Sequence, residues 1–319
     1  MRKSANKVRI SAQLLSVRED KQIWSKRWDR SLEDIFEVQD EVSMDVAGLI
    51  SPVLKGQEHI KLVSKSKRNF SAWDEYLQGL SLYNKGDFVT LSGQILVHIK
   101  KSIRLDANFC DVYVLYCNLL ENLIHSHEHQ NSRTENERLF HQMSQKAVDI
   151  DPENPDAVSA LSLSFNIKKD FDRRFEFAEK ALQLNPNHPR ANFSYGKALA
   201  NFGKFEECLE YVQKAIKLDP FSKVSYEVFL PVIYVALRNW DNALYWIETF
   251  EARTSHSRYF GWKAAVLAHL GKIDLARSSL KKFLRERLEI KTLSDYEKVA
   301  PQIMKEALLE GLKVAGLPE

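Results

Sequence analysis

Residues 180–188 read KALQLNPNH, and residues 214–222 read KAIKLDPFS. A third copy of this phrase, KAVDIDPEN, occupies residues 146–154. In each copy an apolar stripe leads into an Asx-Pro pair, which ends a helix because proline lacks the N–H and disfavours helix in the residue before it. The prolines of the three copies lie 34 residues apart, at Pro152, Pro186 and Pro220. This spacing predicts a structural unit of 34 residues that repeats along the chain.

The unit between Pro186 and Pro220 contains two predicted helices. The first covers residues 191–202 and the second covers residues 206–218, and both carry apolar residues at helical spacing. Gly203 lies between them, where the end of a helix commonly requires a positive φ. The sequence therefore predicts two helices joined by a tight turn.

This helix–turn–helix unit resembles the tetratricopeptide repeat. The small and turn residues of that family's pattern correspond to Gly196, Gly203, Ala215 and Pro220, and Cys208 stands where a small Ala is usual. The resemblance implies a mainly α fold in which successive helix pairs form a right-handed superhelix.

Further units with a similar but less regular sequence pattern lie on both sides of these three copies. We count about six repeats in residues 70–290. A last helix near residues 296–314, within a C-terminal segment of residues 291–319, is expected to cap the array with a more polar outer face. Pro231 falls inside the first helix of the fifth unit and is expected to kink or shorten it.

Residues 1–60 do not follow the repeat. KVRISAQLLSV, at residues 7–17, alternates apolar and polar side chains, and QIWSKRW, at residues 22–28, follows after a short turn, so both are predicted to be strands. Residues 30–50 are predicted to form a helix, with Ser31 as its N-cap. The segment is thus a strand–strand–helix α/β element with too little core to stand alone.

The stretch RISAQLLSVREDKQIWSKRWDRSLEDIFEVQDEV closely resembles the end of a small module similar to the TolB amino-terminal domain, found in bacteria just before tetratricopeptide arrays. Proteins of that family often carry a class III adenylate or guanylate cyclase domain, or a winged-helix DNA-binding domain, further upstream. The C-terminal LLEGLKVAGLPE also resembles the way these chains end.

The resemblance places Met1 in the middle of the α/β module. We therefore expect that the chain is a fragment, that its reading frame is shortened, or that a partner supplies the missing strands. An exposed strand edge can also pair with a second copy of the chain, so a homo-oligomer formed through this N-terminal edge is a further expectation.

The composition limits the classes of partner that the chain is expected to bind. The net charge of +3, from 46 basic and 43 acidic residues, is too small to draw nucleic acid or anionic lipid. No apolar run approaches the ~20 residues of a membrane helix, and the basic opening lacks a continuous signal-peptide core. We therefore expect a cytoplasmic protein that binds neither nucleic acid nor membrane. The three cysteines are expected to be buried packing residues rather than a disulfide framework.

No phosphate loop, dinucleotide fingerprint, zinc-protease helix or nucleophile elbow occurs in the sequence, which predicts a non-enzymatic protein without a cofactor. One chemical oddity is HSHEHQ, in an insertion that lengthens the second repeat by eleven residues. Its three imidazoles, His125, His127 and His129, would capture Zn²⁺ with Glu128 or His141 if the loop were extended. The alternative is a solvated polar insertion.

In tetratricopeptide superhelices the first helix of each repeat lines the concave face, where extended peptides usually lie. The resemblance places six candidate partner-binding residues on this face: Asn118, Asn166, Arg190, Phe193, Lys197 and Tyr234. Their mixture of aromatic, amide and charged groups suits a peptide or protein ligand. Ser159 and Leu163 stand where a carboxylate clamp would need Lys and Asn, so that clamp is not expected.

These observations predict a protein-interaction scaffold that binds a peptide or protein in the concave groove of the repeats. One alternative is the C-terminal regulatory arm of a cyclase-type or transcriptional-regulator signalling protein whose effector domain is absent from this chain. Another is a decayed gene product with no function of its own.

Overall fold

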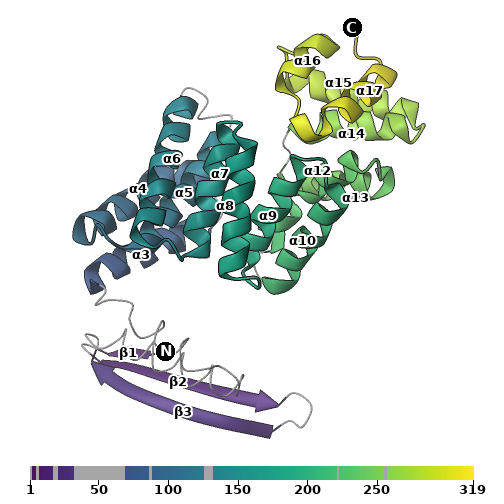
Figure 1. Cartoon of the computed structure of the whole chain (residues 1–319). Helices are drawn as coiled ribbons and strands as arrows, with labels where there is room; N and C mark the ends of the chain where they lie inside the picture. Colours follow the sequence, from purple (N-terminus) through teal and green to yellow (C-terminus); the bar gives the residue numbers. More distant parts are fainter. Residues whose placement is uncertain are drawn as a thin grey trace. The chain divides into compact units, whose positions relative to one another are not determined.

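A computed structural model describes residues 2–4, 7–16, 21–31, 69–85, 88–125, 132–220, 223–254 and 257–319 (Figure 1). The chain divides into two compact units, Met1–Leu115 and Tyr116–Glu319.

An antiparallel sheet opens the first unit, in the order β1-β2-β3. Its strands are β1 (Arg2–Ser4), β2 (Lys7–Ser16) and β3 (Lys21–Ser31). The two long strands confirm the predicted hairpin, and the register that pairs Arg9 with Asp29 lets their side chains form an ion pair. Ser31, expected to cap a helix, is instead the last residue of β3. The remainder of that predicted helix lies outside the described residues.

Successive helix pairs make up the described part of residues 70–286, as the repeat predicts (Figure 1). The pairs are α3 (Phe70–Tyr83) with α4 (Phe88–Leu105), α5 (Cys110–His125) with α6 (Arg133–Ile150), α7 (Pro155–Ile167) with α8 (Phe171–Leu184), and α9 (Pro189–Ala200) with α10 (Phe205–Leu218). The fifth pair joins the broken helix α11 (Lys223–Glu227) and α12 (Leu230–Ala236) to α13 (Trp240–Thr254), and the sixth is α14 (Ser257–His269) with α15 (Ile273–Glu286).

The Asx-Pro phrases end helices, as predicted. Asp151, Asn185 and Asp219 are the C-cap residues of α6, α8 and α10, and each is followed by its proline. The next helix then begins at once: the Asn154 side chain accepts hydrogen bonds from two backbone N–H groups at the start of α7. Local sequence alone therefore sets the period of the repeat.

Two glycines explain how α9 and α10 pack. Gly203 adopts φ +75°, a conformation that glycine reaches without strain, and it makes the turn between the two helices. A Cβ on Gly196 would lie 3.1 Å from the carbonyl oxygen of Cys208, so the absence of a side chain lets the helices approach closely. The predicted small position at Cys208 is accordingly buried, at 0% exposure.

Proline residues break two helices in the C-terminal half. Pro231 sits at the first turn of α12 and separates it from α11, which confirms the predicted shortening. The single capping helix expected at residues 296–314 is wrong in one respect: Pro301 divides it into α16 (Leu293–Val299) and α17 (Lys305–Ala315), joined by the short η3 (Gln302–Met304). Proline cannot donate the N–H that a continuous helix would need at this point.

The insertion in the second repeat coincides with longer helices in that repeat. Helices α5 and α6 have 16 and 18 residues, whereas α7 and α8 of the next repeat have 13 and 14. Much of the extra sequence therefore lengthens the two helices. His127 and His129 lie outside the described residues. The His141 ring is engaged elsewhere, since its Nδ1 lies 2.8 Å from Ser164 Oγ.

The cysteines are buried thiols, as expected from the sequence. Burial raises the pKa of the Cys208 thiol to about 12, so the reactive thiolate is scarce at neutral pH.

We expect none of the three cysteines to react with a thiol reagent such as Ellman's reagent at pH 8 within the time in which an unfolded chain reacts completely. The absorbance of the coloured thiolate that the reagent releases, with and without urea, measures the extent of this reaction. Rapid labelling of the folded chain would contradict the buried placement.

Candidate functional site

Five of the six predicted binding residues lie on three first helices of the second unit. Asn118 is on α5, Asn166 is on α7, and Arg190, Phe193 and Lys197 are on α9. The sixth residue, Tyr234, is on α12, where it is partly buried against two hydrophobic clusters. Its role in binding stays a prediction.

Arg190 connects α9 to α5 across the intervening repeat. Its Nη1 donates a hydrogen bond to Asn118 Oδ1, and its Nη2 lies 3.9 Å from Glu121 Oε2. On the near side, its Nε lies 4.0 Å from Asp156 Oδ1 of α7. Helices α5 and α9 belong to the second and fourth repeats, so these contacts bring together residues 72 positions apart in the chain.

Lys197 reaches the same carboxylate. Its Nζ lies 3.9 Å from Glu121 Oε1, 5.0 Å from the centre of the Phe193 ring and 5.7 Å from that of Phe229. Within the described part of the chain, no acceptor lies at hydrogen-bond distance from this ammonium. Burial lowers the pKa of Lys197, and the like charges of nearby arginines lower it further while Glu121 opposes them.

Aromatic rings flank the ammonium on one side. The Phe193 ring packs edge-on against Tyr226 at 5.1 Å and against Phe229 at 6.2 Å. Burial and the Asp219 carboxylate raise the pKa of Tyr226 to about 12, so its hydroxyl stays neutral. These rings exclude water from one side of Lys197 and leave the Glu121 side polar.

Asn166 serves a second cation, Arg174 on α8. The guanidinium Nη1 donates hydrogen bonds to Asn166 Oδ1 and, at 2.9 Å, to Asn201 Oδ1. Arg174 is 3% exposed, and burial lowers its pKa to about 10. In the described residues no carboxylate lies within ion-pair distance of it. A buried cation held only by amide oxygens favours an added negative charge nearby.

Sequence reasoning missed Arg174 and Glu121. Arg174 lies 34 residues before Cys208, so it occupies a small-residue position of the repeat with a long cation. This departure from the repeat pattern could have identified Arg174 from the sequence. Glu121 lies one turn after Asn118 on α5, where the helical period alone would have placed it on the same face.

We name these residues the inner cluster: Asn118, Glu121, Asp156, Asn166, Arg174, Arg190, Phe193, Lys197 and Asn201. Beside them on α7, Ser159 is 2% exposed, and its Oγ has no hydrogen-bond partner among the described residues. The cluster holds three cations and two carboxylates, and Asp156 is also within 3.4 Å of His188 Nε2. Its local charge is therefore positive, although the whole chain is almost neutral.

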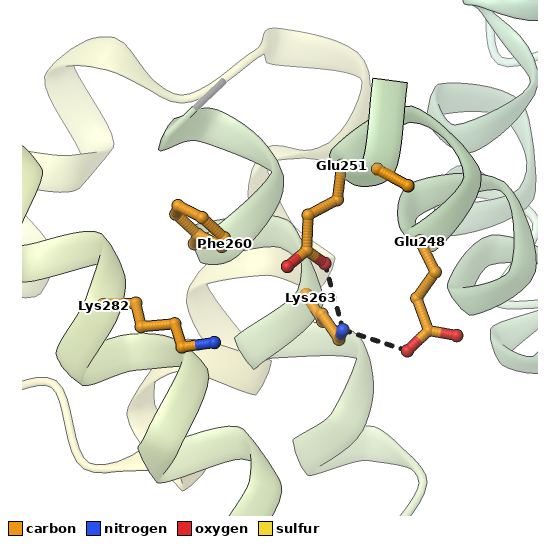
Figure 2. Close-up of a pocket in the computed structure, with 6 residues that line it drawn as sticks. Glu248, Glu251, Phe260, Lys263 and Lys282 are labelled. Atoms are coloured by element: carbon orange, nitrogen blue, oxygen red, sulfur yellow. Dashed lines mark hydrogen bonds and ion pairs between the residues drawn. The ribbon is translucent and has the colours of Figure 1, made fainter. Parts of the chain in front are cut away.

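A second candidate is a surface pocket of about 400 Å³ bordered by α13, α14 and α15. Figure 2 shows Lys263 between two acids of α13, with its Nζ 3.0 Å from both Glu248 Oε1 and Glu251 Oε2. Phe260 and Lys282 form the opposite side, and the Lys282 ammonium lies 5.9 Å from the Phe260 ring centre. The charges of this pocket balance one another, so it favours the binding of an ion less than the inner cluster does.

The described residues contain neither a metal-binding cluster nor a membrane-spanning helix. No group of three or more His, Cys, Asp or Glu side chains there is placed to hold a metal ion. Likewise, none of the described helices combines the length and the apolar character needed to cross a membrane.

The paired helices, their proline-terminated ends and their close crossing at glycine define a mainly α fold of the tetratricopeptide-repeat type. Residues 177–210, from α8 to α10, match the family model described as tetratricopeptide repeat.

Comparison with known proteins gives two kinds of relative. Over 74 residues the chain is 36% identical to a protein of Rhizobium meliloti (strain 1021) named "Putative adenylate cyclase 3". That match covers 23% of this chain and 13% of the other protein, so it spans a small part of each.

Solved structures with a similar fold include PilF of Pseudomonas aeruginosa, with a TM-score of 0.48 and 15% identity over 73% of this chain and 98% of that one. Another is YrrB, described as a tetratricopeptide protein with an unusual peptide-binding site. It aligns with a TM-score of 0.38 and 18% identity over 59% of this chain and 91% of that chain.

Proposed function

We propose that this chain is a protein-interaction scaffold that binds a peptide or protein segment along the inner cluster. The observation that carries the proposal is the Lys197 ammonium, which is largely buried beside two aromatic rings and lacks a hydrogen-bond acceptor in the described chain. Its ion pair with Glu121 is 3.9 Å long, so a ligand that supplies an acceptor at hydrogen-bond distance gives this ammonium a stronger partner.

The surroundings support a peptide rather than a small metabolite. Cations, amides and aromatic rings are distributed over α5, α7 and α9, so that a ligand touching all three helices must be extended. Aromatic and arginine side chains of this kind often dominate protein interfaces. The separate pocket beside Lys263 lacks such an unsatisfied group, and we give it no role in this proposal.

A displayed library of random peptides, selected on the purified chain, tests the proposal. We expect selected peptides to bind, and the double variant Phe193→Ala with Lys197→Glu to weaken their binding at least about tenfold, which corresponds to ~1.4 kcal/mol. Fluorescence anisotropy of the labelled peptides gives the dissociation constants.

The matched control is Tyr245→Ala on α13, a second helix of its repeat. Tyr245 is 61% exposed and lies outside the inner cluster. Binding should stay within about twofold of the unmodified chain, as expected for surface positions away from the ligand. If Tyr245→Ala abolished binding while the double variant did not, the ligand would lie on another face. If no peptide were enriched, the proposal would fail.

A further inference from the structure

The inner cluster contains its own carboxylate between the two cations of α9. Glu121, from α5, reaches over the third repeat to Arg190 and Lys197. Helix α7 lies between α5 and α9 in the chain and presents Ser159, whose hydroxyl is small and buried. The side-chain bridges from α5 to α9 are therefore contacts between non-adjacent repeats.

The contacts of Glu121 with Arg190 and Lys197 are longer than hydrogen bonds. Glu121 oxygens lie 3.9 Å from Arg190 Nη2 and 3.9 Å from Lys197 Nζ. A charge-assisted hydrogen bond between such groups is normally about 2.7–2.9 Å long. The carboxylate is thus close enough to compensate charge but too far to satisfy the Lys197 ammonium. A more mobile carboxylate at the same place would form shorter bonds.

The charge balance also favours a second anion. Glu121 lies 3.9 Å from both Arg190 and Lys197, Asp156 lies 4.0 Å from Arg190, and Asp156 is shared with His188. Among the described residues, the side chain of the buried Arg174 donates hydrogen bonds only to amide oxygens. An acidic group would gain from this excess of cations more than a neutral or basic group would.

We propose that Glu121 is an intramolecular stand-in for a carboxylate of the ligand, which displaces it from between Arg190 and Lys197. This inference rests on the proposed function and names the ligand as an acidic peptide. An apolar side chain next to the acidic one packs against Phe193 and Phe229. The stand-in lowers the affinity of the free site, because the ligand must first displace a bound carboxylate.

The test uses a fluorescein-labelled hexapeptide of alternating Glu and Phe, amidated at its C-terminus, at low ionic strength. Two further probes separate the sources of the carboxylate: the Gln-Phe peptide with an amidated end and the same peptide with a free C-terminal carboxylate. Anisotropy titrations are made with the full chain and with Glu121→Gln, Lys197→Met and Glu210→Gln.

We expect Glu121→Gln to bind the Glu-Phe peptide about tenfold more tightly than the unmodified chain and Lys197→Met to bind it about tenfold more weakly. Glu210→Gln makes the same charge change at an exposed position of α10 and should have no effect beyond about twofold. The amidated Gln-Phe peptide should not respond to Glu121→Gln. A response of the Gln-Phe peptide with a free end alone would assign the site to a terminal carboxylate.

The outcomes distinguish this inference from the proposed function. If library-selected peptides bind and depend on Lys197, but Glu121→Gln does not tighten the Glu-Phe peptide, the scaffold proposal stands and the stand-in is wrong. The same holds if Glu210→Gln tightens binding equally, since general charge would then explain the effect. Failure of all peptides, selected ones included, would overturn both. Circular dichroism of each variant checks that it is folded.

Discussion

Replacing Gly311 with alanine is expected to lower the free energy of unfolding of the second unit by about 3 kcal/mol. Gly311 lies in α17 at its crossing with α14, where a Cβ would be 2.4 Å from the carbonyl oxygen and 2.7 Å from the Cα of Ala265. Both are backbone atoms, so no side chain can turn aside to make room. Helix α17 would have to move away from α14 and open the buried core between them.

Alanine favours a helix over glycine by roughly 1 kcal/mol, and this gain opposes the clash. The steric term is expected to win because it disturbs well-packed neighbours of Gly311 such as Leu308 and Leu312, both 0% exposed. Thermal unfolding followed by circular dichroism should show a midpoint lowered by roughly 6–12 °C.

Gly93 provides the matched control for this prediction. It lies within α4, and a Cβ there would meet nothing within 4 Å. Gly93→Ala should therefore be neutral or stabilise by about 0.5–1 kcal/mol, through helix propensity alone. If Gly311→Ala behaved like Gly93→Ala, α17 would not pack against α14 as the structure places it.

Truncation of Phe283 to alanine is expected to cost about 3–5 kcal/mol. Phe283, on α15, is 1% exposed. Its ring lies 3.1 Å from the position of a Cβ on Gly261 of α14, so the ring fills the space that this glycine leaves. On its other side it packs edge-on against Tyr296 of α16, with ring centres 5.8 Å apart. The truncation would leave a cavity between three helices.

Urea unfolding monitored by circular dichroism and tryptophan fluorescence measures this loss. Phe202→Ala removes the same side chain where it is 48% exposed, and it should cost about 1 kcal/mol or less, the value of its edge contact with Phe175. Equal losses for the two variants would show that the last repeat lacks the tight core described above.

Much of this fold follows from local sequence. The Asx-Pro phrases set the 34-residue period, because proline and its preceding residue end a helix wherever they occur. Gly203 and Gly196 mark a turn and a close crossing for similarly local reasons. The break of the capping helix at Pro301 was equally legible, since the same rule that ended the earlier helices applies there.

The candidate site was predictable only in part. The resemblance to the tetratricopeptide repeat implied that Asn118, Arg190 and Lys197 lie on first helices, and the structure brings Asn118 and Arg190 into contact and places Lys197 beside Glu121. Their binding role stays a prediction. Arg174 was not foreseen, because it is on a second helix and reaches the inner cluster only through the length of its own side chain.

The sequence by itself determined the repeat and the helix ends at its Asx-Pro phrases, since these depend on neighbours within about four positions. Only the tertiary structure decided that Glu121 meets Arg190 and Lys197. Those contacts join helices of the second and fourth repeats. They depend on the distance between α5 and α9, which is set by the packing of α7 between them. That distance is the sum of many packing contacts between helices, which no local pattern records.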